Sequence, residues 1–230
     1  MMKRTVVATV SGAVLLGMAG TGWAQETKAL YPAMAPVEQY RSADEVALAR
    51  SAANEAVSRD AEVLVLGSRG YETAAKGTNG FVCVVERSWA VNFDNPQFWN
   101  PKLRAPHCFN AAAARSVLPA YLKRTELVLS GMPKDQVEVQ MKEAVAKKVF
   151  GAPEQGAMCY MMSKQGYLND DAGHWHPHLM FFLPPTEPAA WGAGMKGSPI
   201  FASKDPAGRM TVFMVPVGKW SDGTPDQHEH

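Results

Sequence analysis

Short apolar runs, bounded by glycine, proline or polar turn residues, constrain the fold of this chain most strongly. About five of them have the length and the content of valine, leucine or aromatic residues that buried strands have. These runs cover residues 61–67, 81–89, 156–163, 174–184 and 209–218. They are separated by longer segments with a helical pattern. The chain is therefore expected to combine a sheet with helices.

Three segments are helical in composition: residues 42–60, 109–131 and 132–151. In the second segment Asn110 is a suitable N-cap, and Pro119 is expected to divide the segment into two helices. The third segment predicts one buried stripe, because apolar residues recur every four positions at Val137, Met141, Val145 and Val149.

The predicted element order is α-β-β-α-α-β-β-β. It indicates an α+β fold, with an antiparallel sheet of about five strands and helices packed mainly on one face. The first two strands are expected to form an antiparallel hairpin. Residues 199–203 are expected to form a short edge strand. The element order, but no residue motif, is similar to that of PAS- and GAF-like ligand-sensing domains.

The N-terminus has the pattern of a secretory signal peptide. Lys3 and Arg4 precede an uncharged apolar stretch, and Gly22 and Ala24 are small residues at the expected cleavage positions. We therefore expect a signal peptide at residues 1–24, an extended lead-in at 25–41, a single α+β domain at 42–220 and a flexible tail at 221–230. The protein is predicted to be exported, either periplasmic or secreted.

Charge and hydropathy narrow the range of partners. The formal net charge is +1, and the chain has no run of basic residues, so no nucleic-acid partner is expected. No later stretch is long and apolar enough for an integral membrane span after signal cleavage. The expected partner is a small molecule or a metal ion, or another protein.

The chain has three cysteines, Cys83, Cys108 and Cys159. Export favours oxidation, and the odd count leaves at least one thiol without a partner in the monomer. The preferred disulfide is Cys83–Cys108. The other two pairings stay open, as does the interpretation of all three as buried thiols.

Three of the six histidines alternate along one predicted strand, at His174, His176 and His178. Alternating side chains on a strand project from one face, so these imidazoles could bind a metal ion. The outer two are about 13 Å apart, so two of them with ligands from elsewhere are preferred. Asp171 and His107 are the other candidate ligands.

The metal would be zinc if carboxylates complete the site, and copper if sulfur does. Residues 158–162 contain Met158, Cys159, Met161 and Met162. The pairing register of this segment with the histidine strand decides which sulfur atoms face the histidines, and the sequence does not reveal it. The apolar face of the histidine strand, with Trp175 and Phe181, is expected to meet the helices.

The alternative is a non-catalytic ligand-sensing or protein-interaction module without a metal. Its predicted ligand pocket is formed by Met158, Tyr160, Met162, Met180 and Trp175. A metal-free hydrolase with a histidine as general base is a third hypothesis. No CxxC, HExxH, P-loop or GxGxxG motif occurs, so the question of whether the protein is an enzyme stays open.

Overall fold

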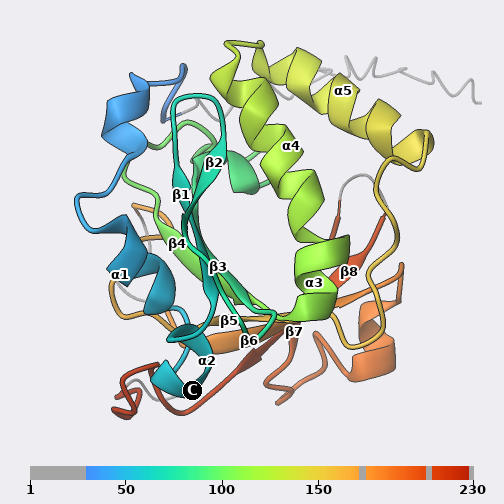
Figure 1. Cartoon of the computed structure of the whole chain (residues 1–230). Helices are drawn as coiled ribbons and strands as arrows, with labels where there is room; N and C mark the ends of the chain where they lie inside the picture. Colours follow the sequence, from blue (N-terminus) through green and yellow to red (C-terminus); the bar gives the residue numbers. More distant parts are fainter. Residues whose placement is uncertain (1–29, 171–174, 206–208, 228–230) are drawn as a thin grey trace, which may run out of the picture.

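The computed structural model describes residues 30–170, 175–205 and 209–227. The expected signal peptide lies outside these residues. Within them, eight strands form one mixed sheet in the order β2-β1-β3-β4-β5-β6-β8-β7 (Figure 1). The strands are β1 (Glu62–Leu66), β2 (Tyr71–Ala75), β3 (Val82–Glu86), β4 (Ala105–Phe109), β5 (Met158–Met161), β6 (His178–Leu183), β7 (Phe201–Lys204) and β8 (Thr211–Pro216).

The α+β class is confirmed, but the predicted sheet of about five antiparallel strands is wrong. β1 and β3 are parallel, and β2 pairs antiparallel with β1 at the edge of the sheet. The segment between the first two predicted strands is therefore a strand and not a hairpin loop. Its side chains are mostly exposed, so β2 lacks the apolar character that identified the other strands.

β4 is the second strand that the sequence did not reveal. It contains Pro106, which cannot donate a hydrogen bond within a sheet. On the side of β5, only Cys108 and Phe109 of β4 have register partners. Pro106 therefore lies outside the part of β4 that pairs with β5. All five residues of β4 are buried. The expected short edge strand at residues 199–203 corresponds to β7.

The helices lie on both faces of the sheet, which corrects the expectation that they pack mainly on one. The helices are α1 (Glu45–Arg50), α2 (Glu55–Ser58), α3 (Ala111–Ser116), α4 (Leu118–Leu129) and α5 (Lys134–Ala146), with 3-10 turns η1 (Val37–Tyr40), η2 (Ser88–Ala90) and η3 (Pro188–Trp191). α1 packs on Val63, Cys83 and Val85. α3 and α4 pack on the opposite face, against Leu64, Val84 and the other residues of that core (Figure 1).

The element order also departs from the PAS- and GAF-like succession. Four strands, and not two, precede the helices α3 to α5, and the sheet continues through β7 to β8. The mixed sheet with helices on both faces therefore gives no support to that likeness.

The sequence predicted the helix boundaries between residues 109 and 131 correctly, but it predicted the buried stripe of the next helix only in part. The Asn110 side chain caps α3 by accepting a hydrogen bond from the Ala113 amide. The division of this segment near Pro119 is confirmed, because α3 ends at Ser116 and α4 begins at Leu118. The predicted buried stripe of the next helix is wrong at its end, since Val137 is fully buried and Val149 is 64% exposed.

A buried ion pair joins α1 to β1 and β3. The Arg87 guanidinium donates to Glu45 Oε2 at 2.6 Å, and the two side chains are 0% and 8% exposed. Glu45 Oε1 accepts a hydrogen bond from the Leu66 amide in β1. Arg87 also donates to the carbonyl groups of Tyr40 and Val85. One pair of charges therefore satisfies backbone groups from η1, β1 and β3.

A chain of hydroxyl groups extends this network to β2 and α4. The Arg87 amide donates to the Tyr121 hydroxyl. The Tyr71 hydroxyl donates its only proton to the Val85 carbonyl, so Tyr121 donates to Tyr71, 3.0 Å away. α4 is thus bonded to Arg87, the residue directly after β3 that also contacts α1, and the edge strand β2 is bonded to Val85 of β3.

Among the described residues, the helices are too short or too polar to cross a membrane.

Replacing Glu45 with alanine should lower the free energy of unfolding by about 3–5 kcal/mol, because the Arg87 charge would stay buried without a counter-ion. Urea unfolding followed by circular dichroism measures this change. Glu38→Ala serves as the control, since Glu38 is exposed, and should change stability by no more than about 0.5 kcal/mol. Equal, small changes for both variants would contradict the role of the ion pair.

Candidate functional site

The sheet brings two of the predicted ligand histidines into one cross-strand row. Met161 in β5 is the register partner of His178 in β6. β4 pairs with β5 through Cys108–Tyr160 and Phe109–Cys159, so His107 comes directly before the paired residues and projects from the same face of the sheet as Met161. We call His107, Met161 and His178 the His-Met row. The two histidines are separated by two strand spacings, roughly 9.6 Å.

The His-Met row lies on the face of the sheet that α3 and α4 cover. His107 is two residues from Phe109, and His178 is four residues from Phe182, so each shares a face with that phenylalanine. Phe109 and Phe182 both belong to the core under α3 and α4. The expectation that the opposite face of β6 meets the helices is therefore wrong: Phe181 packs on Trp191 of η3, with ring centroids 5.9 Å apart.

His107 is buried, with 3% of its surface exposed. Its Nδ1 atom lies 2.9 Å from the Ala105 carbonyl oxygen and 3.7 Å from Glu86 Oε2. Burial lowers the pKa of His107 to about 4, and burial raises the pKa of Glu86 to about 8 against the opposing effect of Arg124. At neutral pH this contact joins a neutral imidazole to a neutral carboxylic acid.

His178 is held in the same way from a different strand. Its Nδ1 atom lies 2.8 Å from the His176 carbonyl oxygen, and the Trp175 ring stands edge-on to the imidazole at 5.7 Å between centroids. Burial lowers the pKa of His178, and repulsion from His107 and His176 lowers it further, while the bond to His176 opposes the shift.

Both histidines therefore have the same tautomer. A carbonyl oxygen only accepts hydrogen bonds, so Nδ1 carries the proton in each ring and Nε2 carries the lone pair. Among the described residues, neither Nε2 atom has a hydrogen-bond donor. Two imidazole lone pairs are thus present in one row of the sheet, and each ring is fixed by the backbone.

Apolar side chains pack around Met161, the middle residue of the His-Met row. Met161 is 4% exposed and forms a small core with Leu103 and Ala105. Val91, Leu168 and Trp175 pack on this core. The Trp175 indole donates to the Gly166 carbonyl and stands edge-on to Trp220, so its position is fixed from two sides.

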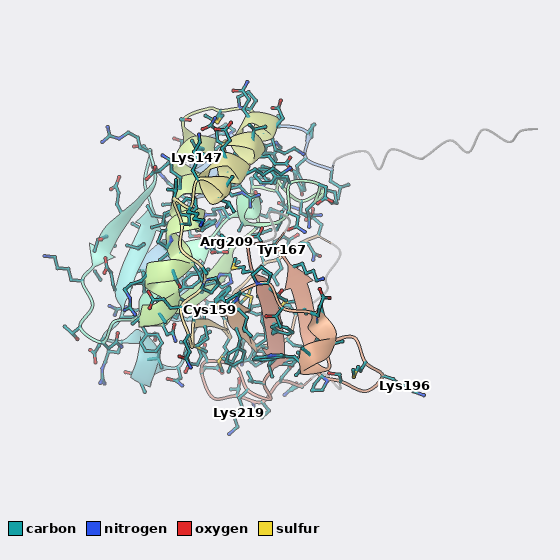
Figure 2. All side chains as sticks on the ribbon, turned by 90° about the vertical axis from the view of Figure 1, so that its right-hand side faces the viewer. Lys147, Cys159, Tyr167, Lys196, Arg209 and Lys219 are labelled. Carbon is teal, nitrogen blue, oxygen red and sulfur yellow. A yellow bond between two sulfur atoms is a disulfide. The ribbon has the colours of Figure 1, made fainter. Side chains whose placement is uncertain are left out.

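Sulfur atoms occupy the next row on the same face. Cys159 is the register partner of Met180, and Met180 is the partner of Met214. Cys159 is fully buried, and burial raises the pKa of its thiol well above the ordinary value. Figure 2 shows Cys159 within the body of the molecule, whereas Lys196 projects away from it after η3.

The other predicted metal ligands are not part of this row. His174 and Asp171 lie outside the described residues. His176 precedes β6, and its Nδ1 atom lies 2.7 Å from Asp226 Oδ2, a carboxylate that is 0% exposed. His176 thus contributes its carbonyl group to the row while its side chain contacts the C-terminal turn.

The predicted ligand pocket is divided between the two faces of the sheet. Met158 and Tyr160 alternate with Cys159 along β5 and so project from the opposite face. Met180 and Trp175 lie on the His-Met side, and Met162 follows the end of β5. The structure therefore does not bring these five residues together.

A cleft of about 360 Å³ lies elsewhere, between the lead-in segment, the loop before β4 and the junction of α4 with α5. Its walls include Tyr31, Phe98 and Trp99, and Lys134 contributes its charge. None of the predicted ligand-pocket residues lines it.

Within the described parts of the chain, no three His, Cys, Asp or Glu side chains are grouped closely enough to hold a metal ion. A metal site there would need another ligand type beside the two histidines. Sequence reasoning also missed Glu86, which lies at the end of an apolar run and gives no sequence signal of a contact with His107.

Cys83 and Cys108 form a disulfide and are direct register partners in β3 and β4. This is the preferred pairing from the sequence, and Cys159 is a free, buried thiol. Closing a loop with a sequence separation of 25 stabilises a fold by roughly 3 kcal/mol. The disulfide fixes the strand that carries His107.

Comparison of the chain with protein-family models, with curated proteins and with solved structures gave no match.

The shifted pKa values of Glu86 and His107 predict a characteristic pH dependence. Between pH 6.5 and 8 the folded protein keeps the Glu86 proton that the unfolded chain releases, so stability should fall as pH rises, by up to about 1.4 kcal/mol per unit. Between about pH 4.5 and 6.5, His107 acts in the opposite direction, because the unfolded chain binds the histidine proton first, so the two groups offset each other and stability should depend little on pH. The free energy of unfolding of the metal-free protein in urea, measured at a series of pH values, tests both ranges.

Glu86→Gln should flatten the limb between pH 6.5 and 8, since glutamine does not titrate. Glu126→Gln is the matched control on an exposed position of α4 and should leave the slope unchanged. A slope that survives in Glu86→Gln would show that another group is responsible.

Proposed function

We propose that this protein is an exported metal-binding protein whose ion, zinc or copper, binds to the Nε2 atoms of His107 and His178. The observation that carries the proposal is the shared tautomer: each ring donates Nδ1–H to a backbone carbonyl and leaves Nε2 as an electron-pair donor. Histidines that bind metals in proteins are almost always oriented by such a contact at the other ring nitrogen.

The placement of the two histidines supports the same proposal. They come from strands far apart in the sequence, and only the sheet brings them into one row. An ion between them would lie above β5, the strand that separates them. Each imidazole would have to reach across one strand spacing of about 4.8 Å, and Nε2 is the ring nitrogen farther from the backbone.

Two imidazoles need at least one more ligand for a stable site. The structure offers Met161 within the row and Glu86 beside His107. A carboxylate would favour zinc, and a thioether would favour copper. We assign no catalytic step to this site.

The disulfide supports export, because disulfides persist in oxidising compartments and are rare in the cytosol. The signal-peptide pattern at residues 1–24 points to the same location. An exported protein binds metal ions outside the cytosol, where cytosolic thiols do not compete for them.

A metal-free ligand-binding module is the second candidate. The cleft beside Phe98, Trp99 and Lys134 favours it, because apolar walls with a single charge suit a small organic anion. This function would not involve the His-Met row.

The exported chain, purified without an affinity tag and dialysed against zinc or copper, should retain about one ion per molecule. His107→Gln and His178→Gln should each lose most of this metal, since glutamine keeps a polar side chain but is a poor ligand. Elemental analysis measures the ratio, and circular dichroism shows whether each variant is folded.

His176→Gln is the matched control, because it changes a neighbouring histidine that lies outside the row and leaves the backbone carbonyl in place. It should retain the metal. The proposal would be abandoned if folded wild-type protein took up no metal, or if His176→Gln lost as much metal as His178→Gln. The cleft would then become the better candidate.

A further inference from the structure

We infer that the site is selective for Cu(I), with Met161 as the third ligand between His107 and His178. The protein would then bind copper in its reduced state and discriminate against zinc. This inference rests on the proposed function and goes further, because it names the ion, its oxidation state and the ligand that selects it.

The position of Met161 is the first argument. It is the register partner of His178, and it projects from β5, the strand between those of His107 and His178, on the face that both histidines share. With 4% of its surface exposed, it is not displaced toward solvent. A thioether is a soft, neutral ligand, and soft sulfur ligands select Cu(I) among the metals of biology.

The position of Glu86 is the second argument. Its carboxyl group approaches the Nδ1 edge of the His107 ring, at 3.7 Å, and not the Nε2 edge that carries the lone pair. Glu86 therefore lies beside the Nδ1 edge of the ring, which already donates to the Ala105 carbonyl. The carboxylate ligand that zinc would favour is on the wrong side of the imidazole for a site shared with His178.

The surroundings of the row are the third argument. Its three ligands are neutral, and Val91, Leu168 and Trp175 pack on the apolar core that contains Met161. Transferring an ion from water to such surroundings is costly, and the Born cost grows with the square of the charge. A monovalent ion is therefore strongly favoured over a divalent one. The adjacent row of Cys159, Met180 and Met214 adds polarisable sulfur on the same face.

The test compares two methionines of the same strand. Met161→Leu removes the thioether from the His-Met row, and Met158→Leu removes one from the opposite face of β5. Cu(I) affinity is measured without oxygen by competition with bicinchoninate, and Zn(II) affinity by competition with a zinc-binding dye. Thermal unfolding of the metal-free proteins shows whether the variants are folded.

Met161→Leu should weaken Cu(I) binding by at least about tenfold, the lower range for loss of a supporting contact in a metal site, and should change Zn(II) affinity much less. Met158→Leu should change neither. The inference is overturned if Met161→Leu leaves Cu(I) affinity unchanged, or if it weakens both ions equally. Failure of the proposed function itself would look different, since neither ion would then depend on His178.

A measurement on the unmodified chain keeps the inference testable if Met161→Leu does not fold. With ¹³C-methyl methionine labelling, addition of Ag(I), a redox-stable substitute for Cu(I), should shift the Met161 methyl resonance and leave Met158 in place. An unchanged Met161 resonance at saturating Ag(I) would exclude it as a ligand.

Discussion

The buried ion pair between Glu45 and Arg87 is the interaction on which the rest of the structure depends. It satisfies backbone groups of η1, β1 and β3, and the hydroxyl chain through Tyr121 and Tyr71 extends it to α4 and β2. Because successive side chains of an extended segment project to opposite faces, holding Arg87 toward α1 directs Glu86 to the other face. That is the face on which Glu86 meets His107.

Register is the second constraint on the site. A slip of one residue between two strands would turn every side chain of one strand to the other face. The Cys83–Cys108 disulfide joins direct register partners, so it excludes such a slip between β3 and β4. His107 is the neighbour of Cys108 and is therefore fixed on the face opposite the disulfide. The covalent link on one side of the sheet thus keeps a histidine in place on the other side.

The errors in the fold prediction have a common physical origin. β2 is an exposed edge strand, and β4 contains a proline and a histidine, so neither has the apolar pattern of a buried strand. β2 is stabilised by its hydrogen bonds to β1 and by the Tyr71 hydroxyl. β4 is stabilised by burial between β3 and β5. Pairing partners far away in the sequence decide both strands, and no local pattern contains that information.

Part of the candidate site follows from the local sequence, and part depends on strand pairing between segments that are distant in the sequence. The sequence alone determined that His178, Met180 and Phe182 share one face of a strand, because the period of two is a property of the extended backbone itself. It also contained the signals for α3, for the division near Pro119 and for β5, β6 and β8. Only the tertiary structure decided that His107 and Met161 join His178 and that His176 does not. The reason is that strand pairing, and not sequence distance, brings β4, β5 and β6 together, whereas His176 lies before the paired part of its strand.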